Sequence, residues 1–301
     1  MDINTLAGLI LSGISRGMIY ALMTVGLALI LGILNIPNFA QGEFYMIGAY
    51  MAWFTIGVLH LNPIIALFSA ALASFVVGVF CEKILFTPLR KFGGRGWLLN
   101  VFVLTLGLSL ILQNIALVTI GPLYYGVPYV WSPNVVNLFG VGISSYDRLM
   151  IIIIGSITII VLWMFLKKSR LGRAIRAVAQ DPIAASLMGV NLKTIYTITN
   201  GLGCMLSSIA GALTISILPA YPTMGIIPLY KAWFVIIMAG LGTIGACIPI
   251  GILLGVVETV GVAVASEGWQ NVIYLAIICI LLIFKPFGLF RKGEVRGIWE
   301  K

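Results

Sequence analysis

Few ionisable side chains lie within the apolar stretches of this 301-residue sequence, and they are the first candidates for chemistry. Glu43 and Glu258 lie inside such stretches, and Arg16 and Glu267 lie nearer to stretch ends. A charged group in lipid is costly and normally faces a partner or a water-filled cavity. A proton pathway would show several such groups in series, so we favour an internal hydrogen-bond partner for Glu258 over a transported-proton site.

A second polar group follows Pro37 in the segment NFAQGEF, which brings Asn38, Gln41 and Glu43 together. Two interpretations stay open for these residues: a turn at the membrane interface, or a polar lining of a translocation path. With Glu258, they form our candidate set for such a path.

The sequence offers little for catalysis. It contains no G-x-x-x-x-G-K-[ST] phosphate loop and no H-E-x-x-H metal motif, and His60 is its single histidine. The four cysteines are isolated from one another, without a C-x-x-C pair. We therefore expect no catalytic residues, no metal site, no cofactor and no nucleotide site, so that energy for any work must come from elsewhere.

Composition defines the class of protein. Hydrophobic residues make up 61% of the chain and charged residues 9%, and the mean hydropathy is +1.12. Repeated apolar runs of about 17–25 residues indicate membrane-spanning helices. We predict an all-α fold: one transmembrane domain over residues 1–301, a polytopic helix bundle of about eight or nine spans. The first run, Leu6 to Ile36, is interpreted as a retained helix rather than a signal peptide.

The later runs set the expected helix boundaries. A long run, 232–265, is expected to divide around Gly245–Pro249, after a proline-rich loop at 219–231. Two pairs of small residues, Ser207 with Gly211 and Gly251 with Gly255, predict close helix packing, which we place within one bundle rather than between subunits. The other predicted spans cover 44–59, 64–81, 98–120, 149–166, 194–218 and 269–284.

The net charge of +9 has a topological explanation. Of the 18 Lys and Arg residues, 15 fall in three intervals: Lys83–Arg95, predicted to be a loop, Lys167–Lys193 and Lys285–Lys301. Such clusters beside apolar helices indicate the cytoplasmic side, which places 121–148 and the N-terminus outside. Membrane topology and contact with anionic lipid headgroups account for the charge, without nucleic acid.

The segment 167–193 contains signals for a short exposed helix. Asp181 is a good N-cap, Pro182 suits the first helical position, and Gly189 suits the residue after the C-terminus. About two turns, centred on Ile183–Met188, are too short to be stable alone in water. Because its small face is apolar, we expect this helix to dock onto another protein.

Three segments resemble a known family. They are NFAQGEFYMIGAY at 38–50, SRLGRAIRAVAQDPIAASLMGVN at 169–191 and KAWFVIIMAGLGTIGACIPIGILLGVVE at 231–258. The chain resembles, almost end to end, the permease subunits of branched-chain amino acid ABC importers of the shorter, LivH type. It departs from that pattern at Gln41, where His is common, and at Thr243 and residues 246–248, where Ser and Pro-Gly-Ala are more frequent.

The resemblance implies a half-transporter in the bacterial inner membrane. Its partners would be a homologous permease in a heterodimer, two cytosolic ATPase subunits and a periplasmic substrate-binding protein. The short helix would couple to the ATPase. The residues to which this role is carried over are Asp181, Pro182, Ile183, Ala184, Ala185, Leu187, Met188 and Gly189.

Two alternatives remain at this stage. One is a permease of the same architecture for urea, short amides or other amino acids, because a separate binding protein would select the solute. The other is an autonomous secondary transporter or channel, which would transport without ATP.

Overall fold

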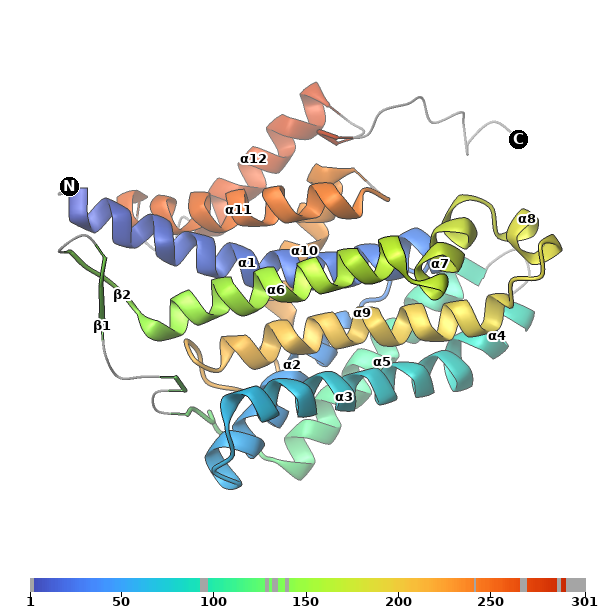
Figure 1. Cartoon of the computed structure of the whole chain (residues 1–301), viewed down its shortest axis with the longest axis horizontal. Coiled ribbons are helices and arrows are strands. Elements are labelled where there is room, and N and C mark those ends of the chain that lie inside the picture. The colour runs from blue at the N-terminus through green and yellow to red at the C-terminus, as the bar shows by residue number, and fades with distance from the viewer. Residues whose placement is uncertain are drawn as a thin grey trace.

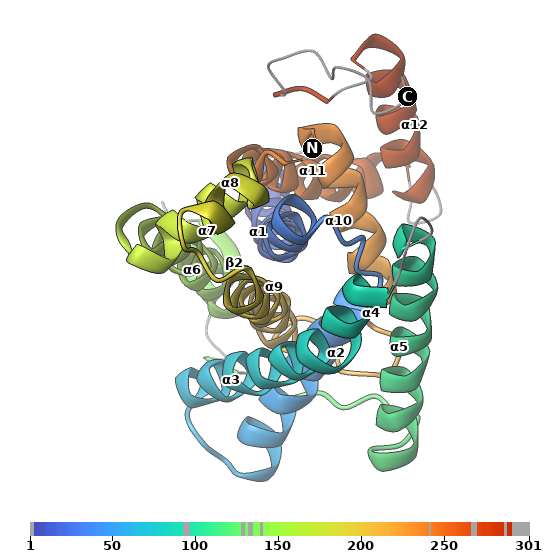
Figure 2. The same cartoon turned by 90° about the vertical axis from the view of Figure 1, so that its right-hand side faces the viewer.

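One central helix, α1 (Ile3–Leu34), organises the bundle. It is surrounded by α6 (Tyr146–Lys168), α9 (Leu192–Thr214), α10 (Ile226–Ala239) and α11 (Ile244–Ala265) (Figure 2). Of its apolar part, 89% is buried within the chain. The computed structural model describes residues 3–92, 97–127, 130–131, 135–138, 141–240, 242–265, 270–285 and 288–290.

Small residues allow the backbones of α1 and α11 to touch. A Cβ added at Gly255 would lie 2.3 Å from the backbone nitrogen of Gly17, and one at Gly251 would lie 2.9 Å from Cα of Ala21. Gly211 of α9 is equally close to the backbone of α2 (Gln41–Trp53) at Tyr45. The predicted packing of the small-residue pairs within one bundle is therefore confirmed.

The peripheral helices carry most of the surface that faces outward. Helix α3 (Pro63–Cys81) continues through a π-helical turn at Glu82–Phe86 into α4 (Thr87–Phe92), and α2 likewise ends in a π-helical turn at Phe54–Val58. Helices α5 (Trp97–Thr119) and α12 (Gln270–Phe284) lie at the edge of the bundle (Figure 2).

The all-α prediction is confirmed, with one addition. The segment predicted to be an external loop contains a hairpin of β1 (Val135–Leu138) and β2 (Val141–Ser145). In the described part of the chain, nine helices have 13 or more residues. Within the residues that the structure describes, five helical segments are long and apolar enough to span a membrane by themselves: 6–34, 63–90, 99–119, 146–168 and 244–263.

The predicted loop at 83–95 is wrong over residues 83–92, which are helical. Pro88 is compatible with this helix because it closely follows the wider π-helical segment, in which the hydrogen bonds shift from four to five residues back. The ion pair of Arg90 with buried Glu82, at 2.5 Å, holds the helix across this turn. Residues 93–95 lie outside the described residues.

The predicted division at Gly245–Pro249 is also misplaced. The helical conformation is interrupted at Gly240 and Gly242, whose φ values of 94° and 93° favour glycine. Pro249 lies inside α11. Residues 226–231, predicted to belong to a loop, form the start of α10. Pro228 falls in the first turn, where its missing N–H has no intrahelical partner to lose.

The described basic clusters share one end of the bundle. Helices α4, α7 (Arg170–Gln180) and α8 (Pro182–Leu187) lie together at this end, and the N-terminus of α1 and the hairpin lie at the other (Figure 1). Of the third cluster, 285–301, only 285 and 288–290 are described. This arrangement agrees with the predicted topology, in which the first two clusters face the same compartment.

The topology generates the first testable prediction. In a cysteine-free background, Leu123→Cys should react with a membrane-impermeant thiol reagent in intact cells, and Gln180→Cys should react only after permeabilisation. Both side chains are exposed, so accessibility of the compartment decides the result. The reverse pattern would contradict the assignment of the basic end to the cytoplasm.

The α1–α11 contact generates the second. Gly255→Ala should lower the stability of the purified protein by about 1–3 kcal/mol or more, because the new methyl group would meet backbone rather than a flexible side chain. Gly107→Ala in α5 is the control: nothing lies within 4 Å of its Cβ position, so it should be neutral or slightly stabilising. Thermal unfolding in detergent measures both, and equal effects would contradict the packing argument.

Candidate functional site

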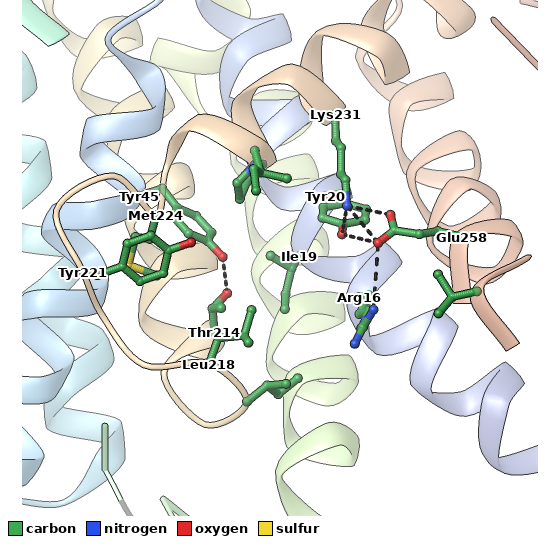
Figure 3. Close-up of a pocket in the computed structure, with 14 residues that line it drawn as sticks. Arg16, Ile19, Tyr20, Tyr45, Thr214, Leu218, Tyr221, Met224, Lys231 and Glu258 are labelled. Atoms are coloured by element: carbon green, nitrogen blue, oxygen red, sulfur yellow. Dashed lines mark hydrogen bonds and ion pairs between the residues drawn. The ribbon is translucent and has the colours of Figure 1, made fainter. Parts of the chain in front are cut away.

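A cavity of about 330 Å³ lies among α1, α2, α9, α10, α11 and the connection between α9 and α10. Its two walls differ in chemistry: charged groups gather on one side, and aromatic, hydroxyl and apolar groups lie across from them (Figure 3). The charged wall consists of Arg16, Tyr20, Lys231 and Glu258.

A buried ion pair forms the centre of the charged wall. Lys231 Nζ lies 2.8 Å from each carboxylate oxygen of Glu258, and the two residues are 2% and 3% exposed. The ammonium also donates to the Tyr20 hydroxyl at 2.8 Å, and that hydroxyl donates to Glu258 Oε1 at 3.2 Å. Arg16 is more distant, with Nη1 3.9 Å from Oε1.

Three helices supply these groups. Arg16 and Tyr20 lie on α1 four residues apart, which places them on one face. Lys231 comes from α10, and Glu258 comes from α11. The predicted internal partner of Glu258 is therefore present, and it is a cation as well as a hydroxyl.

Sequence reasoning missed Lys231. The proline-rich segment before it suggested a loop, so Lys231 counted as a loop cation. The usable signal was the run IIPLYKAWFVIIMA, because one proline in the first turn is compatible with a helix. That interpretation makes Lys231 an ionisable residue inside an apolar segment, as Glu258 is.

The opposite wall is uncharged. Tyr45 donates to Thr214 Oγ1 at 2.6 Å, and Tyr221 and Met224 lie beside them (Figure 3). Leu218 contributes an apolar surface on the connection after α9.

The other three predicted path residues lie elsewhere, and none of them lines this cavity. Asn38 accepts from the Ala40 N–H and donates to Gln41 Oε1, and Gln41 donates to Gly203 O at 2.8 Å and Ser207 Oγ at 2.6 Å. These bonds pin the start of α2 to the middle of α9.

Glu43 forms a separate contact with α5. Its Oε1 accepts from Ser109 Oγ at 2.8 Å and from Gln113 Nε2 at 2.7 Å, and its side chain is buried. The role of Asn38, Gln41 and Glu43 in a path stays a prediction. Glu267, noted above, lies outside the described residues.

A hydrolase-like pattern, G-x-S-x-G, occurs at residues 13–17, but its structural context is that of a helix. Ser15 lies inside α1, is fully buried and donates to the Ser12 carbonyl at 2.8 Å. The nucleophile of a hydrolase instead lies on a sharp turn between strand and helix. Among the described residues, no group of three or more His, Cys, Asp or Glu could hold a metal ion.

Comparison with known proteins identifies the family. Residues 9–283 match the family described as "Branched-chain amino acid transport system / permease component". The chain belongs to this family.

Two individual relatives are similar over nearly the whole length of the permease, and a third over part of it. It is 30% identical to the high-affinity branched-chain amino acid transport system permease protein BraD of Pseudomonas aeruginosa, over 96% of this chain and 97% of that protein. The LivH permease protein of the corresponding Escherichia coli system is 28% identical, over 95% and 96%. Escherichia coli LivM is 26% identical, over 65% of this chain and 50% of LivM.

The predicted coupling segment of the permease forms α8, with the expected end signals. Asp181 Oδ1 accepts from the Ile183 and Ala184 N–H groups at 2.8 and 3.0 Å, Pro182 is the first helical residue, and Gly189 has a φ of 85°. Of the eight residues predicted to couple, Asp181 therefore caps the helix, Pro182 begins it and Gly189 follows its end.

The side chains of α8 divide between two directions. Ile183, Leu187 and Met188 are 73%, 84% and 85% exposed, and Ala184 is exposed with them. Ala185 is 5% exposed and therefore faces the rest of the permease. The apolar side chains of α8 therefore point away from the permease, at the end of the bundle that carries the basic clusters (Figure 1).

Helix α7 was not predicted from the sequence. Ser169 caps it by accepting from the Gly172 N–H at 2.8 Å, and Gly172, Ile175 and Val178 are buried. Their spacing of three along the chain was the available signal, which the density of arginines obscured. Helix α7 connects α8 to α1 and α9, with which it is in contact.

The ion pair generates the third prediction. Lys231→Met should destabilise the permease by about 3–5 kcal/mol, because it strands a buried carboxylate. Adding Glu258→Leu to Lys231→Met should recover most of this loss. Thermal unfolding of Lys231→Met, of Glu258→Leu and of the double variant measures the interaction energy of the pair. Glu258→Gln, which keeps the shape of the side chain, is measured beside them. Additive single effects, without recovery, would contradict a coupled pair.

Proposed function

We propose that this permease is the membrane-spanning subunit of an ATP-binding-cassette importer that moves branched-chain amino acids across the bacterial inner membrane. Separate ATPase subunits supply the energy, and the permease itself performs no catalysis. Family membership and the names of the relatives support the class of solute.

The observation that carries the proposal is the exposed apolar face of α8. A six-residue helix gains little stability from its own hydrogen bonds, and the large apolar side chains at its tip gain nothing in water. A groove on a cytosolic partner would bury Ile183, Leu187 and Met188 together, as an amphipathic helix docks into a groove. We assign that partner to the ATPase, and two copies serve a pair of permeases.

The fold offers a route from this contact to the cavity. Helix α8 joins α7, whose Gly172 lies against the backbone of α6 at Phe165, so α7 is held close to α6. Helix α7 contacts α1, and α1 carries Arg16 and Tyr20 in the cavity wall. A displacement of α8 driven by ATP would thus be passed to α1 as a rigid element.

The remaining partners follow from the relatives. Similarity to both LivH and LivM of one organism supports pairing with a homologous permease as a heterodimer. A periplasmic substrate-binding protein would deliver the amino acid at the end that carries the hairpin, opposite to α8 (Figure 1).

The fourth prediction tests α8. Leu187→Glu and Ala184→Asp should abolish co-purification of the ATPase and substrate-stimulated ATP hydrolysis in liposomes, because each buries an unpaired carboxylate in the contact. Asp181→Ala removes a cap worth about 1 kcal/mol and should weaken coupling only modestly.

Thr194→Glu is the matched control. It adds the same charge at the same end, at an exposed position in the first turn of α9 that favours acidic residues. This variant should retain the ATPase. Wild-type association and hydrolysis in Leu187→Glu would show that α8 is an ordinary solvated segment.

A further inference from the structure

Among the residues that the structure describes, the charged wall of the cavity contains two cations and one carboxylate. Arg16, Lys231 and Glu258 together carry a net charge of +1. Lys231 is within hydrogen-bond distance of both carboxylate oxygens, whereas Arg16 Nη1 is 3.9 Å from Oε1, beyond a hydrogen bond. The Arg16 side chain is also 42% exposed, against 1% for Glu258.

Arg16 lies where two recesses meet. It lines the cavity and also a neighbouring recess with Ser12 and Arg148, and Val262 is shared by both. Arg148 donates to Ser12 Oγ. The connection that closes the cavity pairs with Tyr125 through Ala220, which places this region toward the end of the hairpin.

The wall across from the charges suits a short apolar group. Ile19 lies between the two walls, and Leu218 and Met224 lie across from Glu258 (Figure 3). A ligand that fits this division has both charges at one end and a compact hydrocarbon at the other.

We propose that the cavity holds the amino acid as a zwitterion, with its α-carboxylate on Arg16 and its α-ammonium on Glu258. This inference rests on the proposed function and adds a location to it. To admit the ligand, the partly exposed Arg16 side chain turns away from Glu258, because 3.9 Å leaves no room for both ligand groups between them; one long contact is then replaced by two short ones. Lys231 and Tyr20 stay on the carboxylate of Glu258 and hold it in place.

The physical reason is the cost of charge away from water. A zwitterion that crosses a bundle must have both charges compensated, since an unpaired charge in a medium of low dielectric is heavily penalised. Arg16 offers two parallel N–H donors, the geometry that a carboxylate accepts. A neutral solute such as an amide would have no use for this cation.

The test uses the complete importer, with its partner permease and ATPases, in a background without native cysteines. Ile217→Cys places a thiol in the cavity wall at a partly exposed position. Millimolar leucine should slow the reaction of this thiol with N-ethylmaleimide, whereas leucinamide, which lacks the carboxylate, should not. Leu59→Cys, exposed outside the cavity, should react equally with and without leucine.

Variants assign the carboxylate contact. Arg16→Gln should raise the leucine concentration for half-protection about 10- to 100-fold, the value of a charge-assisted hydrogen bond. Arg16→Lys, which keeps the charge, should restore part of the protection. Arg148→Gln is the matched control, since this arginine lines only the neighbouring recess, and it should leave protection unchanged.

Leucine uptake by proteoliposomes that contain the same complexes distinguishes the location of the amino acid from the importer function. Uptake without protection of Ile217→Cys, or equal protection by leucine and leucinamide, would overturn the assignment of the cavity and leave the importer function standing. Absence of ATP-driven leucine uptake by the unmodified complex would overturn the importer function itself.

Discussion

The burial of one carboxylate and one ammonium sets the geometry on which the cavity depends. Glu258 and Lys231 are almost completely removed from water, and either charge alone would be severely destabilising in that position. The two are therefore stable only when α10 and α11 hold them at the same level. Tyr20 of α1 completes the contact by bonding both partners, so three helices are constrained by one interaction.

The contact is reached because α1 and α11 approach more closely than ordinary side chains permit. Gly17 and Gly255 touch at backbone level, and Gly251 does so with Ala21. Glu258 lies one turn beyond Gly255 and is thereby brought to the face that carries Arg16 and Tyr20. Close packing of small residues and pairing of charges are thus two parts of the same arrangement, and neither would serve without the other.

Polar residues at the break between α1 and α2 satisfy a related requirement. Backbone and side-chain polar groups inside a membrane bundle need internal partners, because lipid supplies none. Asn38 and Gln41 supply these partners to each other, to Ala40 and to α9, which explains why a broken helix is tolerated there. Asn38 and Gln41 are fully buried, and Glu43 is turned toward α5; for all three residues a role in a translocation path stays a prediction.

Local properties of the sequence determined the class of the protein, the positions of most helices and the ends of α8. Hydropathy acts residue by residue, and a cap such as Asp181 or a terminating residue such as Gly189 depends on neighbours only a few positions away. The predictions for residues 83–92 and for the helix interruption at Gly240–Gly242 were wrong, because proline ends a helix at some positions and is tolerated at others. Only the tertiary structure decided that Lys231, 27 residues before Glu258, and Tyr20, 238 residues before it, meet that carboxylate. Those distances in the chain are closed by helix packing, and no periodicity or motif in the sequence encodes which buried charge will face which.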